Sequence, residues 1–179
     1  MNRVKIEIAK KTLDILNTQS FRNIDINSVK NFKNQNLIKT KKDLLANINN
    51  FFDFQLKENI SSIETSTSKD MLFEILMVRF DILNCYRKPI LKLVKHFQSN
   101  PKDFVTFIPT LIQSIILMLT LSNTNLKGFK GAVKIKSLFI LYILTVFVWK
   151  NDDTESLEKT MTALDKYLDQ FDRIKKVFD

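Results

Sequence analysis

The sequence has very few residues that break helices or that build disulfides and metal sites. Its 179 residues include two glycines, three prolines, one cysteine and one histidine. So few turn-forming residues are typical of long helices joined by short loops. The single cysteine, Cys85, excludes an intramolecular disulfide, and the single histidine, His96, has no second His or Cys to complete a zinc site. We therefore expect a helical protein without a bound metal, in which Cys85 is a small buried apolar residue.

Groups that could carry catalysis are also scarce. Neither glycine belongs to a phosphate-binding loop, and Ser114 has no neighbouring His–acid pair to activate it. Asp152, Asp153 and Glu155 lie close together, but this spacing is more typical of a helix cap than of an acid–base pair. The sequence thus predicts a protein that is not an enzyme, has no catalytic residues and holds no cofactor.

Positive charge is in excess and is distributed unevenly. The net charge is +9; residues 1–60 hold 11 Lys/Arg against 6 Asp/Glu, and residues 61–179 hold 17 against 13. Such an excess favours binding to DNA phosphates or to anionic lipid, because counterions are released. The alternative is a solvated surface on a basic protein.

No segment of the sequence is typical of a membrane span or of a secretion signal. The first residues lack the apolar core of a signal peptide. Residues 104–121 are apolar but contain Pro109, Gln113 and Ser114, and residues 137–149 are shorter than the roughly 20 residues that a span needs. We expect both segments to be buried core helices of a cytoplasmic protein with no transmembrane segment.

Helix start signals divide the chain into an all-α arrangement. Thr40–Asp43 and Thr67–Asp70 have the spacing of capping boxes, and Asn100 and Pro101 form a start signal. Asp152 or Asp153 is the expected cap of the last helix. Residues 59–68 form a polar linker rich in Ser and Thr. The prediction is a small N-terminal helical domain of residues 1–58 and a five-helix C-terminal bundle of residues 67–179.

The last two predicted helices indicate a dimer. The helix from about residue 131 to 149 is apolar on most of its faces, so that one bundle cannot easily cover it. The final helix adds an apolar stripe, which suggests a two-fold four-helix contact. The predicted dimer residues are Leu138, Tyr142, Leu157, Met161, Leu164 and Leu168.

Four segments, residues 21–29, 40–45, 72–81 and 149–168, resemble the TetR/AcrR family of bacterial transcriptional regulators, and in particular an alphaproteobacterial subgroup. The resemblance implies a TetR-like fold, a helix-turn-helix type N-terminal unit, a homodimer, and an apolar small molecule bound in the C-terminal bundle. One interval departs from the family: residues 30–39 are about six residues shorter than its turn and recognition helix, and contain neither Gly nor Tyr.

The resemblance suggests two groups of site residues. In the shortened interval and after it, lysines with no acid among them and amides could contact DNA: Lys30, Lys33, Asn34, Gln35, Lys39, Lys41 and Lys42. The same segment could instead be a solvated loop. The candidate ligand pocket comprises Met77, Phe80, Phe97, Phe107 and Met118, although most aromatic residues of this region could equally form a packed core. A second interpretation is a lipid-binding accessory protein of ubiquinone biosynthesis, which resembles the same fold but does not bind DNA.

Overall fold

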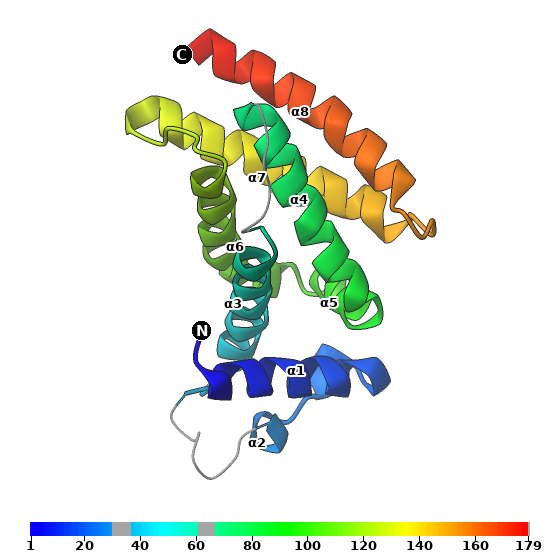
Figure 1. Cartoon of the computed structure of the whole chain (residues 1–179). Coiled ribbons are helices and arrows are strands. Elements are labelled where there is room, and N and C mark those ends of the chain that lie inside the picture. The colour runs from blue at the N-terminus through cyan, green and yellow to red at the C-terminus, as the bar shows by residue number, and fades with distance from the viewer. Residues whose placement is uncertain (30–36, 61–66, 179) are drawn as a thin grey trace. The chain divides into compact units, whose positions relative to one another are not determined.

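The computed structural model describes residues 1–29, 37–60 and 67–178, and every regular element in them is helical. The predicted all-α class is therefore confirmed, with eight α-helices and no strand over these ranges (Figure 1). In chain order the elements are α1 (Arg3–Thr18), the 3-10 helix η1 (Phe21–Asn23), α2 (Ile26–Val29), α3 (Lys41–Asn59), α4 (Ser68–Cys85), α5 (Arg87–Ser99), α6 (Pro101–Leu121), α7 (Gly128–Lys150) and α8 (Glu158–Phe178).

The predicted capping boxes begin α3 and α4. At α3, the backbone N–H of Asp43 donates to Thr40 Oγ1 at 3.2 Å, and the N–H of Thr40 donates to Asp43 Oδ2 at 2.8 Å. The hydrogen bond from the Lys39 N–H is the main reason why the pKa of Asp43 lies below its usual value. At α4, the N–H of Asp70 donates to Thr67 Oγ1 at 3.1 Å. Both helices thus start where local hydrogen bonds satisfy their first free N–H groups.

Contacts between residues divide the chain into two compact units. Unit 1 comprises Met1–Glu58 and Asp81–Leu111, and unit 2 comprises Asn59–Phe80 and Ile112–Asp179. Helices α4 and α6 each contribute one part to either unit. The division groups α5 with the N-terminal helices, whereas the sequence-based boundaries, 1–58 and 67–179, placed it in the C-terminal domain.

Unit 1 is built around α1, α3 and α5. Leu13 and Leu16 of α1 are fully buried, and burial of each such side chain contributes roughly 1.5–3 kcal/mol relative to exposure. The Asn47 side chain of α3 donates to the Lys5 carbonyl of α1 at 2.9 Å. Helix α5 packs against α1 and η1, where the ring of buried Phe21 meets the ring edge of His96 at a centroid distance of 5.0 Å. The N-terminal helices therefore share one core with α5.

Unit 2 is dominated by the pair α7 and α8, which pack against each other along their length (Figure 1). Phe80 of α4 stacks on Tyr142 of α7 at a centroid distance of 5.6 Å, and both side chains are buried. Gly131 is required near the start of α7, because a Cβ built there would lie 1.9 Å from the carbonyl oxygen of Leu126. Asp152, which is buried, holds the corner between the two helices through hydrogen bonds from Thr154 and Thr160.

Two sequence-based expectations about burial need correction. Cys85, expected inside the core, is exposed at the end of α4. Helices α6 and α7 were expected to be buried core helices, yet only 33% of the most apolar 18-residue window of each is buried. Both helices are long and apolar enough to cross a membrane, by length and composition alone. Helix α7 packs against α8, which is amphipathic with charged residues on its outer side, so that one side of α7 is covered by α8.

Candidate functional site

Positive charge is concentrated in unit 1. The residues of unit 1 include 16 Lys/Arg and 8 Asp/Glu, a net charge of +8, whereas those of unit 2 include 12 and 11, a net charge of +1. From the sequence, the density of positive charge was highest in the first 60 residues. Residues 81–111, which fold with the N-terminal helices, add five cations and two acids and were not singled out. The signal was present as a stretch without an acid between Asp81 and Asp103.

The predicted DNA-binding residues fall partly outside the described ranges: Lys30, Lys33, Asn34 and Gln35. Of the other three, Lys39 and Lys42 are exposed at the start of α3. Lys41 is half-buried, and its ammonium group donates to the carbonyl of Arg22 in η1. Lys41 therefore ties η1 to α3, while Lys39 and Lys42 remain available to a partner in solution.

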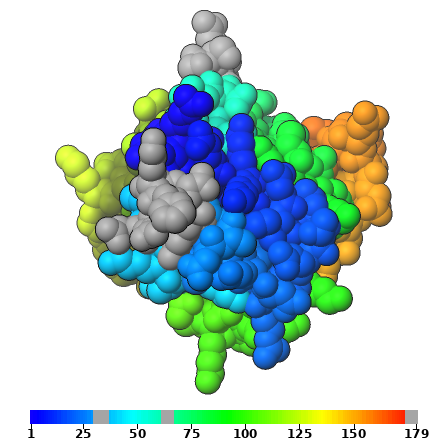
Figure 2. Space-filling model, turned by 90° about the horizontal axis from the view of Figure 1, so that it is seen from below, coloured from blue at the N-terminus to red at the C-terminus, as the bar shows by residue number. Residues whose placement is uncertain are grey.

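The turn at η1 and α2 contributes further exposed polar groups. Ile24 and Val29 are buried and hold this turn in unit 1. The carboxylate of Asp25 accepts from the N–H of Asn27 at 3.0 Å, as expected for the start of α2. Arg22 and Asn27 are exposed on the outside of the turn. Figure 2 shows the segment from α1 to α2, in blue, at the surface of the molecule.

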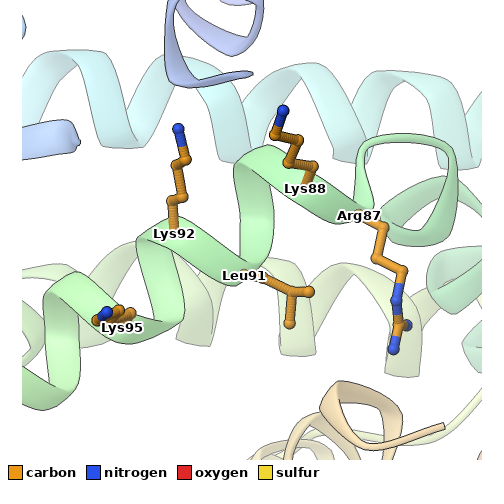
Figure 3. A pocket seen from close by; sticks show the side chains of 5 residues that line it. All are labelled: Arg87, Lys88, Leu91, Lys92 and Lys95. Atoms are coloured by element: carbon orange, nitrogen blue, oxygen red, sulfur yellow. The ribbon is translucent and has the colours of Figure 1, made fainter. Parts of the chain in front are cut away.

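A second basic surface lies on α5. An open hollow of about 400 Å³ is lined by five residues of this helix, shown in Figure 3: Arg87, Lys88, Leu91, Lys92 and Lys95. The ammonium of Lys92 also donates to the carbonyls of Asn17, at 3.1 Å, and of Gln19, at 3.4 Å. These carbonyls lie at the C-terminal end of α1, where a cation is favourable to the helix dipole. Lys92 thus connects the hollow to α1.

The predicted pocket residues fall into both units. Phe97 and Phe107 belong to unit 1, where their rings stack at a centroid distance of 5.3 Å. Met77, Phe80 and Met118 belong to unit 2, in which Phe80 and Met118 are fully buried. None of the five lines the hollow on α5. Phe80 packs as a core residue, and the binding of an apolar ligand by this set stays a prediction.

The predicted dimer residues are mostly enclosed within the chain itself. Leu138, Tyr142, Leu157, Leu164 and Leu168 are buried inside unit 2, and a side chain that is already covered is not available to a second subunit. Met161, the sixth residue of the predicted set, is exposed (41%), and so are three residues of α7 that were not predicted: Ile140 (58%), Leu144 and Phe147 (46% each). Ile140, Leu144 and Phe147 have the spacing i, i+4, i+7 and share one face of α7. We call Ile140, Leu144, Phe147 and the predicted Met161 the outer apolar face of α7 and α8, because these side chains are open to a partner.

Over the parts of the chain that the structure describes, no three His, Cys, Asp or Glu side chains are grouped so that they could hold a metal ion. His96 has its Nε2 2.8 Å from Asp103 Oδ2 and packs its ring on Phe21, which is the role of a histidine at the edge of a core.

No protein-family model matches the chain, and no curated protein matches it.

Proposed function

We propose that the protein is a homodimeric, TetR-like transcriptional regulator that contacts DNA through unit 1. The observation that carries this proposal is the segregation of charge: unit 1 holds +8 of the net +9. A net charge of this size on about half of the chain attracts a polyanion and is screened by salt. The order of the elements supports the same family, since short N-terminal helices are followed by longer ones that end in a packed pair, α7 and α8.

Contacts to DNA would come first from the exposed cations near η1 and α3. Arg22, Lys39 and Lys42 are at the surface, and a phosphate can accept hydrogen bonds from each. Because the interval before α3 is short, we propose that Arg22, Lys39 and Lys42 contact the phosphate backbone. Contacts to the bases would come from the other predicted residues, Lys30, Lys33, Asn34 and Gln35. Such contacts make affinity strongly dependent on salt.

A second copy of the chain would cover the outer apolar face of α7 and α8. In a monomer, Ile140, Leu144, Phe147 and Met161 stay in water, although burial of apolar surface is favourable by about 25 cal/mol per Å². A two-fold contact lets the same face cover itself. In this mechanism an apolar ligand in the C-terminal bundle changes the separation of the two basic heads, and thereby their fit to DNA.

The second candidate is a lipid-binding accessory protein without DNA binding. It is favoured by the apolar stretches of α6 and α7, of which only one-third is buried, and by Phe129 at the start of α7, which is 76% exposed. An exposed aromatic ring flanked by Lys127 and Lys130 is a combination that binds anionic lipid surfaces, because the ring enters the apolar layer and the lysines contact the headgroups.

The test is DNA binding measured by fluorescence anisotropy. The purified protein is titrated onto a labelled fragment of its own promoter and onto random DNA, at two salt concentrations. A regulator binds the promoter with a preference that survives both salt and random competitor. In the variant Lys39→Gln/Lys42→Gln we expect weaker binding and a salt slope that is lower by about 2, because each lost phosphate contact removes roughly 0.9.

The matched control removes two exposed lysines from unit 2, Lys159→Gln and Lys166→Gln, and should leave the slope unchanged. Equal binding to promoter and random DNA that disappears with salt would refute the regulator. Co-sedimentation of the same protein with vesicles that contain anionic lipid would then support the second candidate.

A further inference from the structure

We propose that the hollow on α5 binds a small organic carboxylate with an apolar body, and that Lys92 transmits the occupancy of the hollow to the end of α1. The site lies within unit 1 and is separate from the predicted pocket of the C-terminal bundle. Binding of the anion does not depend on the proposed function. Only the regulatory consequence, a change in the DNA-binding head, rests on it.

The five lining residues form one continuous band on the helix. At about 100° per residue, Arg87, Leu91, Lys95, Lys88 and Lys92 follow one another around an arc of roughly 140°. Figure 3 shows Lys88 and Lys92 leaving one side of α5, and Arg87 and Leu91 leaving the other. Cations therefore border the hollow on both sides, and a bound anion can meet more than one of them.

The three lysines of this band, Lys88, Lys92 and Lys95, have no ion-pair partner within the described chain. Lys88 and Lys92 are separated by one helical turn, as are Lys92 and Lys95, and like charges at these spacings are unfavourable. An anion relieves this repulsion, so that its binding has a favourable contribution beyond each single contact.

The shape and chemistry of the hollow select the ligand. The hollow is open to solvent and has a volume of about 400 Å³, so that it can hold a small molecule that stays partly exposed. Leu91 and the aliphatic stems of the lysines supply the apolar lining, and the charged ends of Lys88, Lys92 and Arg87 extend away from it on both sides of α5 (Figure 3). Arg87 adds a guanidinium group that also donates to Asn84 Oδ1 at 3.3 Å. A carboxylate attached to an aliphatic or aromatic body meets both requirements.

Lys92 gives the hollow a connection to the N-terminal helices. An ammonium group has three N–H donors, and that of Lys92 faces the carbonyls of Asn17 and Gln19. A carboxylate in the hollow is a stronger acceptor than a backbone carbonyl, because it is charged. It therefore draws the ammonium away from α1 and weakens the hydrogen bonds that join the end of α1 to α5. The loss of these bonds changes how α1 is held against the rest of the proposed DNA-binding unit, unit 1.

The first experiment measures binding by isothermal titration calorimetry in the absence of DNA, with octanoate as the probe and with octan-1-ol and inorganic phosphate as comparisons. We expect octanoate to bind at least tenfold more tightly than either comparison. The variant Lys88→Gln/Lys95→Gln should weaken octanoate binding at least tenfold. The control Lys57→Gln/Lys102→Gln removes the same charge from exposed positions of unit 1 and should bind like the unaltered protein.

The second experiment tests the connection through Lys92. Octanoate is added to the ¹⁵N-labelled protein, and backbone amide signals of residues 17–19 are followed; they should shift with saturation, and should not do so in Lys92→Gln. Octan-1-ol binding as tightly as octanoate, unchanged octanoate affinity in Lys88→Gln/Lys95→Gln, or unshifted signals at residues 17–19 would overturn the proposal. If the protein binds octanoate as expected but does not prefer its own promoter, the carboxylate site on α5 is supported and the proposed regulator function is refuted.

Discussion

A single buried carboxylate, that of Asp152, holds the corner between α7 and α8, so that its removal should have a measurable effect on stability. Asp152 Oδ1 accepts from the Thr154 N–H at 3.2 Å and hydroxyl at 2.6 Å, and Oδ2 accepts from the Thr160 N–H at 2.7 Å and hydroxyl at 2.8 Å. Burial by itself would raise the pKa of Asp152, but these hydrogen bonds outweigh it and lower the pKa from 3.8 to about 2. The folded state therefore favours the ionised form.

The size of the effect follows from that shift. One pKa unit corresponds to about 1.36 kcal/mol, so that ionised Asp152 contributes on the order of 2 kcal/mol to the free energy of unfolding. The substitution Asp152→Asn keeps the shape and removes the charge. We expect it to lower the free energy of unfolding by about 2 kcal/mol at pH 7, and the melting temperature by roughly 4–8 °C.

The pH dependence provides a second readout. The pKa of Asp152 is lower in the folded than in the unfolded chain, so that its contribution is complete well above pH 3.8 and is lost as the pH falls toward about 2. The difference between the unaltered protein and Asp152→Asn should therefore shrink by about half between pH 7 and pH 3.

Urea denaturation followed by circular dichroism, at one fixed protein concentration, measures both quantities. The control is Glu155→Gln, which removes the same charge from an exposed position three residues away and should change the free energy of unfolding by less than about 0.5 kcal/mol. A loss below about 0.5 kcal/mol in Asp152→Asn at pH 7, or a difference that does not decrease at pH 3, would refute the reasoning.

Three further predictions concern unit 2. Gly131→Ala should destabilise the protein by more than about 2 kcal/mol in thermal denaturation, since the new Cβ collides with the backbone of Leu126; a change as small as that of an ordinary surface Gly→Ala would contradict this close approach. Leu164→Glu should abolish the cooperative unfolding of unit 2, because it places a charge in a fully buried position. Phe147→Glu should keep the fold and convert a dimer to a monomer in light scattering. A Phe147→Glu protein that is still a dimer would show that the outer apolar face is not the interface. Lys69→Gln, which breaks a surface ion pair of α4 with α8, should cost less than about 1 kcal/mol and become neutral in high salt; a larger loss that persists in salt would be inconsistent with a surface pair.

Helix starts could be predicted from the sequence because the interactions that define them are local. The capping boxes at Thr40–Asp43 and Thr67–Asp70 join residues three positions apart, and the structure begins α3 and α4 at those places. The last helix was expected to start directly after Asp152 or Asp153, but α8 begins at Glu158; Asp152 instead accepts from the N–H of Thr160 in the first turn of α8. The scarcity of Gly and Pro likewise implied helices throughout.

The faces of α7 could not be predicted in the same way. The helix is apolar almost all round, so that periodicity does not distinguish the side that its own chain covers from the side left at the surface. Packing against α8 and stacking of Tyr142 on Phe80 determine that Leu138 turns inward and that Ile140 and Phe147 turn outward. The residues predicted for the dimer were for this reason mostly those that the chain covers itself.

The sequence by itself determined the helical class, the starts of most helices and the excess of positive charge, because these depend on composition and on residues a few positions apart. Only the tertiary structure decided that α5 shares a core with α1. The two carbonyls that Lys92 contacts lie more than seventy residues earlier in the chain, and no local pattern records a pairing over that distance. That pairing is what gathers nearly all of the net charge into one unit and joins the hollow on α5 to the first helix.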